Sequence, residues 1–178
     1  MEKKQDLPTN TFNKYRQGKN YLYFGLETPH YLTRGQVYVA NSTPTNYGWC
    51  CRLDSKSLAD GLAQIEKGLL QSFQMITPKQ LPQTSKCELV QTCLSHARKR
   101  LELPFQDLEN IWSSNVNKSS VDAYFNNPRE LGMCLPLNNQ PRCFTVTLTI
   151  HGIRLKNQAI GPIITLSKIS PEVDKVWS

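Results

Sequence analysis

Apolar and polar residues alternate almost without exception in the last third of the chain. Every even position over 144–150 is apolar, and every odd position over 143–149 is cysteine or threonine. A period of two is typical of a β-strand with one buried face. The apolar positions change parity after Gly152, which indicates a β-bulge. Residues 160–169 are again rich in apolar side chains, so we predict a C-terminal hairpin that turns at 156–158.

Three short segments near the N-terminus combine aromatic, β-branched and other apolar residues. They span 21–26, 36–40 and 49–53, and they are separated by Thr28-Pro29 and by a loop over 41–48. Short strands with short links favour an antiparallel meander.

The middle of the chain has helical periodicity instead. Apolar residues recur every three or four positions over 57–73, where Ser57 is the expected N-cap. A capping box that begins at Ser85 starts a second helix. We expect a short third helix over 105–112 and, after a polar loop, a helical turn over 121–125.

This order of elements predicts an α+β fold. The expected sheet is antiparallel or mixed, consists of the N-terminal three-strand meander and the C-terminal hairpin, and carries the helical middle segment on one face. A chain of 178 residues suits one domain. We place that domain over 20–178, after a flexible basic arm over 1–19.

The N-terminus is polar, and no apolar run approaches the roughly 18 residues of a membrane span. We therefore expect a cytoplasmic protein that does not enter a membrane.

The formal net charge is +7 and the pI is about 9.2. Such a charge favours an anionic partner, although it can also serve solubility alone.

Basic and aromatic residues are interleaved in the first third of the chain, which is typical of surfaces that contact RNA or single-stranded nucleic acid. Cations neutralise phosphates, and aromatic rings stack on unpaired bases. The candidate phosphate contacts are Lys14, Arg16, Lys19, Arg34 and Arg52, and the candidate stacking residues are Tyr23, Tyr38 and Trp49. The alternative is that most of these rings pack in the core.

Two histidines suggest a different chemistry. His30 stands close in sequence to a tyrosine and an arginine, and His151 stands next to the predicted bulge. A histidine near a cation is what a metal-independent nuclease needs for acid–base catalysis. The alternative is that both are ordinary hydrogen-bonded side chains.

The cysteines do not have the spacing of a structural zinc site. Cys87 and Cys93 are six positions apart, and Cys134 and Cys143 are nine apart, whereas zinc ligands usually pair at two to four. Buried or incidental thiols are the simpler interpretation. We expect no metal and no cofactor.

The leading hypothesis is a non-enzymatic module that binds RNA or single-stranded nucleic acid, as a subunit of a larger complex. The first alternative is a protein-interaction or scaffold subunit with a protein partner or a homo-oligomeric state. In that case Trp112 and Phe125 would be interface anchors if exposed, or core residues if not. The second alternative is the nuclease that uses His30 or His151.

Overall fold

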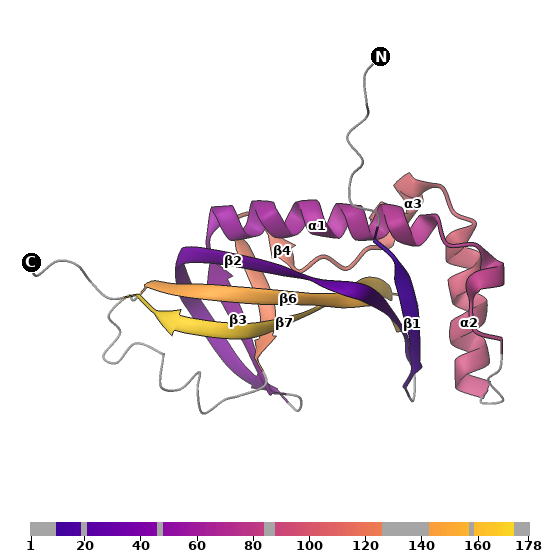
Figure 1. Cartoon of the computed structure of the whole chain (residues 1–178), viewed down its shortest axis with the longest axis horizontal. Helices are drawn as coiled ribbons and strands as arrows, with labels where there is room; N and C mark the ends of the chain where they lie inside the picture. Colours follow the sequence, from indigo (N-terminus) through magenta and orange to yellow (C-terminus); the bar gives the residue numbers. More distant parts are fainter. Residues whose placement is uncertain are drawn as a thin grey trace, which may run out of the picture. The chain divides into compact units, whose positions relative to one another are not determined.

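The computed structural model describes residues 10–18, 21–45, 48–83, 88–125, 143–156 and 159–172 (Figure 1). The strands are β1 (Phe12–Gln17), β2 (Tyr21–Thr45), β3 (Gly48–Asp54), β4 (Val116–Asn117), β5 (Ser120–Phe125), β6 (Cys143–Lys156) and β7 (Ala159–Pro171). The helices are α1 (Lys56–Gln74), α2 (Glu88–Leu101) and α3 (Phe105–Ile111), with a short 3₁₀ helix η1 (Pro78–Gln80). None of these helices is both long enough and apolar enough to span a bilayer.

The described strands form one mixed sheet, and the helices come from the middle of the chain, so the predicted α+β class is confirmed. The strand order is β1-β2-β3-β5-β7-β6, with β4 beside β5 and an additional pairing of β2 with β6. Most of the registered pairs are antiparallel. A parallel pairing of Tyr124 with Thr165, from β5 to β7, makes the sheet mixed.

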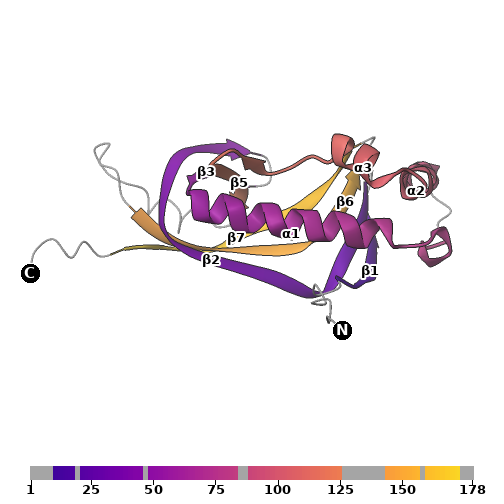
Figure 2. The same ribbon diagram turned by 90° about the horizontal axis from the view of Figure 1, so that it is seen from above.

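Contacts group the chain into two compact units. The first comprises 1–29, 64–114 and 151–163, and the second comprises 30–63, 115–150 and 164–178. The long elements contribute a segment to each unit. Helix α1 is one of them, and it runs without interruption through its glycines Gly61 and Gly68 (Figure 2).

An aromatic cluster forms part of the core of the first unit. The ring of Phe73 on α1 meets Phe24 on β2 edge-on, with centroids 5.4 Å apart. Tyr15 and Phe12 of β1 pack on the same ring, at 5.5 and 6.5 Å. These contacts place α1 on the face of the sheet to which Phe24 belongs. Neighbouring residues of a strand point to opposite faces, so Tyr23 lies on the other face.

Strand β1 lies in the segment that the sequence analysis assigned to a flexible arm. Phe12 is buried and anchors the strand to Phe24, and the β1–β2 ladder runs from Phe12↔Leu26 to Gln17↔Leu22. Residues 1–9 and Lys19 of the proposed arm lie outside the described residues. The segment has little alternation of its own, so its strand conformation depends on the partner.

Strand β2 is continuous where two short strands with a break at Thr28-Pro29 were expected. Proline interrupts a ladder because it lacks an N–H group. The last registered pair with β1 is Phe12↔Leu26, so Pro29 stands beyond that ladder and removes none of its hydrogen bonds.

The segment 121–125 is a strand, so the prediction of a helical turn was wrong. Val121, Ala123 and Phe125 are buried, whereas Asp122 and Tyr124 between them are more exposed. This alternation fits the antiparallel register with β3, in which Leu53 opposes Val121. Lys118, with a φ of 50°, lies in the turn from β4 to β5 within the expected loop.

The first turn of α1 is capped by Ser55 rather than by the expected Ser57. The Ser55 hydroxyl accepts a hydrogen bond from the N–H of Leu58 at 3.1 Å, which is the geometry of an N-cap. The Ser57 hydroxyl instead accepts a hydrogen bond from Arg34 Nε at 2.9 Å.

The change of parity in β6 is confirmed by burial. Phe144 to Ile150 are buried at even positions, and Ile153 and Leu155 are buried at odd positions. Gly152 stands at the change. A Cβ at this position would overlap the carbonyl oxygen of Phe24, so β6 and β2 approach each other more closely here than any side chain would allow.

Candidate nucleic-acid interface

Arg16 and Tyr23 form the centre of the candidate interface in the first unit. They are opposite each other in the register of β1 and β2, on the face away from Phe24. The Arg16 guanidinium carbon lies 5.6 Å from the centroid of the Tyr23 ring, which is within the range of a cation–π contact. The exposed arginine is therefore stacked on a half-buried ring.

Glycines make room for the tyrosine rings on this face. A Cβ at Gly25 would lie 2.8 Å from Cε1 of Tyr23 and 2.9 Å from Cβ of Lys14. Gly18 has the same relation to Tyr21, whose ring would overlap any Cβ there. The Tyr23 hydroxyl also donates a hydrogen bond of 3.3 Å to the carbonyl oxygen of His151. The Tyr23 ring therefore packs beside Gly25 on β2, and its hydroxyl group reaches the backbone of β6.

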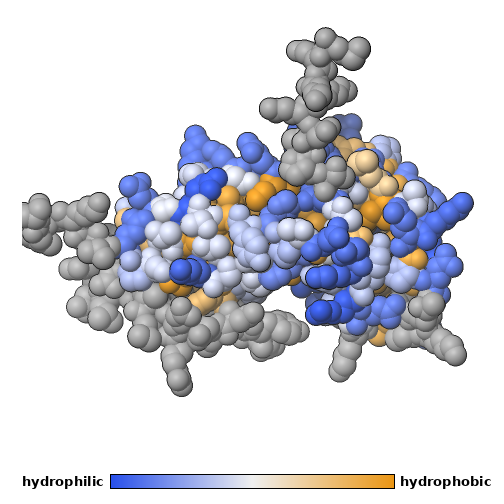
Figure 3. Space-filling view, in the orientation of Figure 1, coloured by the Kyte–Doolittle hydropathy of each residue, from blue (hydrophilic) through white to orange (hydrophobic). Residues whose placement is uncertain are grey.

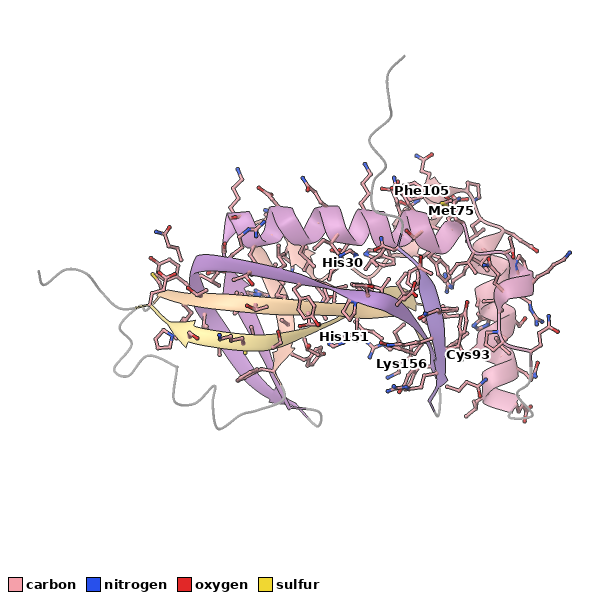
Figure 4. All side chains as sticks on the ribbon, in the orientation of Figure 1. His30, Met75, Cys93, Phe105, His151 and Lys156 are labelled. Atoms are coloured by element: carbon pink, nitrogen blue, oxygen red, sulfur yellow. The ribbon has the colours of Figure 1, made fainter. Side chains whose placement is uncertain are left out.

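Two further cations follow His151 along β6. Arg154 is exposed and Lys156 half-buried, and they alternate with Ile153 and Leu155, which are fully buried. Side chains of one strand alternate between faces, so Arg154 and Lys156 point away from the core side that Ile153 and Leu155 occupy. We therefore assign them to the face of Tyr23, which is also the face away from the core. Lys156 is labelled near the end of β6 in Figure 4.

We name this surface the basic-aromatic face and define it by Lys14, Arg16, Tyr21, Tyr23, Arg154 and Lys156. Figure 3 shows hydrophilic side chains gathered over β1 and the adjoining strand ends. Glu27, two positions beyond Gly25, is the only acidic residue of the first unit's strand segments that the structure describes. No ion pair involves the basic side chains of the face within the described part of the chain.

Burial controls the ionisation of the central ring. It raises the pKa of Tyr23 above its ordinary value of 10.0, and the nearby charge of Arg16 lowers that pKa in part. The phenol is therefore neutral at physiological pH, and its hydroxyl keeps the proton that it donates to β6. The face holds its positive charge without a phenolate to offset it.

Three predicted site residues, Lys14, Arg16 and Tyr23, thus come together on one face. Lys19 lies outside the described residues, and the side chain of Trp49 is not among those described. Arg154 and Lys156 were missed by the sequence analysis. The change of parity at Gly152 could have identified them, because it assigns Ile153 and Leu155 to the buried face of β6 and Arg154 and Lys156 to the other face.

The other predicted residues belong to the second unit, and both arginines among them form hydrogen bonds within the chain. Arg34 Nη1 donates to the carbonyl of Thr33 at 2.8 Å, in addition to the bond from Nε to Ser57. Arg52 forms an ion pair with Asp122 at 3.3 Å. Tyr38 is 45% exposed. These bonds occupy part of the donor capacity of Arg34 and Arg52.

His30 and His151, labelled in Figure 4, belong to different units. Both are half-buried, on β2 and β6. Burial lowers the pKa of each below the ordinary value of 6.5, so the neutral imidazole is favoured in the folded protein.

These shifts predict that stability falls between pH 7.5 and pH 5.5. The unfolded chain binds protons at these imidazoles at a higher pH than the folded protein, so stability is complete above about 6.5 and declines below it. We expect a decrease of at most about 1 kcal/mol, because both rings keep contact with solvent. Urea denaturation at three pH values measures it, and His151→Gln should flatten the profile.

The carboxylate of Glu172 does not disturb this range. Hydrogen bonds from Gln36 and Thr145 lower its pKa below 4.5, so it loses stabilising bonds only under more acidic conditions. A wild-type stability that is constant or increases from pH 7.5 to 5.5 would contradict the assignment.

The cysteines provide no candidate centre in the described part of the chain. Cys93, labelled in Figure 4, is buried on α2, and Cys143 is half-buried at the start of β6. Cys87 and Cys134 lie outside the described residues. No group of three metal-ligating side chains occurs among those that the structure describes.

The aromatic residues on either side of the 113–120 loop face inward to different degrees. Phe125 is only 3% exposed, so its interpretation as a core residue is confirmed. The Trp112 indole N–H donates to the buried carboxylate of Glu66 at 3.3 Å, and Ser114 donates to the same oxygen at 2.6 Å. Trp112 is therefore tied to α1.

A comparison of the chain with known protein families, with curated proteins and with solved structures finds no match.

Proposed function

We propose that the protein binds single-stranded nucleic acid, RNA in particular, on the basic-aromatic face. The observation that carries this proposal is the stack of Arg16 on Tyr23, with Lys14 on the same strand as Arg16 and Arg154 and Lys156 on β6. Cations without internal acidic partners are available to phosphates. Most of the affinity for a nucleic acid comes from such contacts.

The arrangement of the rings favours unpaired bases over a duplex. A base can stack on an aromatic ring or on the plane of an arginine, and only a single strand exposes its bases for this. The outer side of the Arg16 guanidinium, which covers Tyr23, is the surface that we assign to a base. Tyr21, two positions along β2, provides a second ring on the same face.

The test is the affinity of the full chain for a single-stranded RNA over a series of salt concentrations. Four cations predict that the logarithm of the association constant falls with the logarithm of salt with a slope of about −3, at roughly −0.7 per phosphate. An RNA duplex of the same sequence should bind more weakly. This comparison separates stacking from charge attraction alone.

The outcome also separates the alternatives. Absence of binding at low salt would reject the proposal and favour the protein-interaction function, whose own readout is the oligomeric state in light scattering. Cleavage of the RNA during the assay would favour the nuclease function of His30 or His151. Substitution of each histidine would then locate the activity.

A further inference from the structure

A cavity lies at the C-terminal end of α2 in the first unit, apart from the residues that define the basic-aromatic face. Its volume is about 270 Å³. His96, Lys99, Arg100 and Leu103 line it. Three nitrogen-bearing side chains and one apolar side chain thus border a space that is open to solvent and large enough for a small anion.

The lining is basic, and one of its donors is unsatisfied. No carboxylate is present among the described residues that line the cavity. The Nε atom of Arg100 is buried and has no hydrogen-bond partner in the part of the chain that the structure describes. Burial also lowers the pKa of Arg100 below its ordinary value. A buried donor without a partner is costly, so an anion that accepts a hydrogen bond from this N–H would stabilise the site.

Two of the last carbonyl groups of α2 already accept hydrogen bonds within the chain. The last carbonyl groups of a helix carry partial negative charge. Here the carbonyl of Lys99 accepts from the N–H of Glu102 at 3.2 Å, and that of Arg100 accepts from Leu103 at 3.1 Å. These two acceptors are satisfied within the chain, and Lys99 and Arg100 are the charged donors of the lining that a ligand could use.

We infer that this cavity binds the phosphate group of a phosphate monoester. Arginine and lysine supply the charged donors that phosphate oxygens prefer. Leu103 provides an apolar wall for the organic part of the ester. The same chemistry comes from two sources, the terminal phosphate of an oligonucleotide or a small phosphorylated metabolite. The inference does not depend on the proposed function, because it uses different residues.

The test measures binding of inorganic phosphate, of a nucleoside 5′-monophosphate and of a short oligoribonucleotide with and without a 5′-phosphate. Isothermal titration of the full chain at constant ionic strength gives each affinity. We expect saturable binding of inorganic phosphate that Lys99→Gln weakens about tenfold or more. Arg100→Gln should act in the same direction.

Arg98→Gln is the matched control, because Arg98 is on the same helix and its replacement removes the same charge without altering the cavity lining. Lys99 is exposed, so Lys99→Gln keeps the result interpretable even if Arg100→Gln fails to fold. Lack of saturable phosphate binding, or an equal loss in Lys99→Gln and Arg98→Gln, would overturn the inference. If the 5′-phosphate tightens binding of the oligonucleotide and Lys99→Gln removes that gain, nucleic acid is the source; if the 5′-phosphate adds nothing while the monophosphate binds saturably, the source is a small molecule.

Discussion

Replacement of Gly152 by alanine is expected to lower the free energy of unfolding by about 3 kcal/mol or more, or to prevent folding. The new Cβ would overlap the carbonyl oxygen of Phe24 and lie 3.0 Å from Cα of Gly25. Both are backbone atoms and cannot rotate away. The φ angle of 157° at Gly152 is also one that other residues rarely adopt.

The consequence extends beyond the point of contact. Separation of β6 from β2 at this position would move Phe24, on which Phe12, Tyr15 and Phe73 pack. It would also lengthen the hydrogen bond from Tyr23 to the carbonyl of His151. The core and the basic-aromatic face therefore depend on the same glycine.

Gly68→Ala is the matched control for this experiment. Gly68 is inside α1, and the nearest atom to an added Cβ is Asn10 Nδ2 at 3.5 Å, an ordinary contact. Alanine is the better helix former, so this change should raise the free energy of unfolding by about 0.5–1 kcal/mol. Chemical denaturation of both variants measures the difference. A Gly152→Ala protein as stable as the wild type would exclude the close approach of the two strands.

Reversal of charge at Arg16 and Arg154 together is expected to weaken binding of single-stranded RNA by about 100-fold or more at low salt. Each change removes a cation that neutralises a phosphate and adds a repulsive charge beside the path of the backbone. The slope of the salt dependence should become shallower by about 1.4 at least, at roughly 0.7 for each phosphate that is no longer neutralised. Fluorescence anisotropy of a labelled oligonucleotide over a salt series gives both quantities.

The double variant Lys67→Glu/Lys79→Glu controls for net charge. Both lysines are exposed, on α1 and on η1, and their reversal changes the total charge by the same amount. This variant should retain most of the affinity, because its charges are not on the face. Equal losses of affinity in the two double variants would show that only total charge matters, and the assignment of the face would then be wrong. Circular dichroism should confirm that both variants are folded.

The sequence predicted elements where one pattern repeated for long enough. The period of two in β6 and the apolar stripe of α1 each continue over several turns or pleats, so burial followed the pattern. The strand β5 is short, and a few apolar positions do not distinguish a strand from one turn of helix. Its conformation depends on β3, whose Leu53 and Cys51 oppose Val121 and Ala123.

The candidate interface was predictable only in part, because it too depends on contacts between segments that are far apart in the sequence. Composition singled out Lys14, Arg16 and Tyr23, because cations and rings alternate near the N-terminus. It also singled out Arg34 and Arg52, and no local pattern shows that a cation has an internal partner such as Ser57 or Asp122.

The sequence by itself determined the α+β class, the alternation of β6 and its change of parity, because these depend on residues close together in the chain. The tertiary structure alone decided that β2 pairs with β6 and that Arg154 and Lys156 join Tyr23 on one face. That decision depends on a contact between residues 128 positions apart. The pairing of β2 with β6 depends on the close packing of Gly152 on the backbone of Phe24. Neither segment has a sequence pattern that predicts this contact.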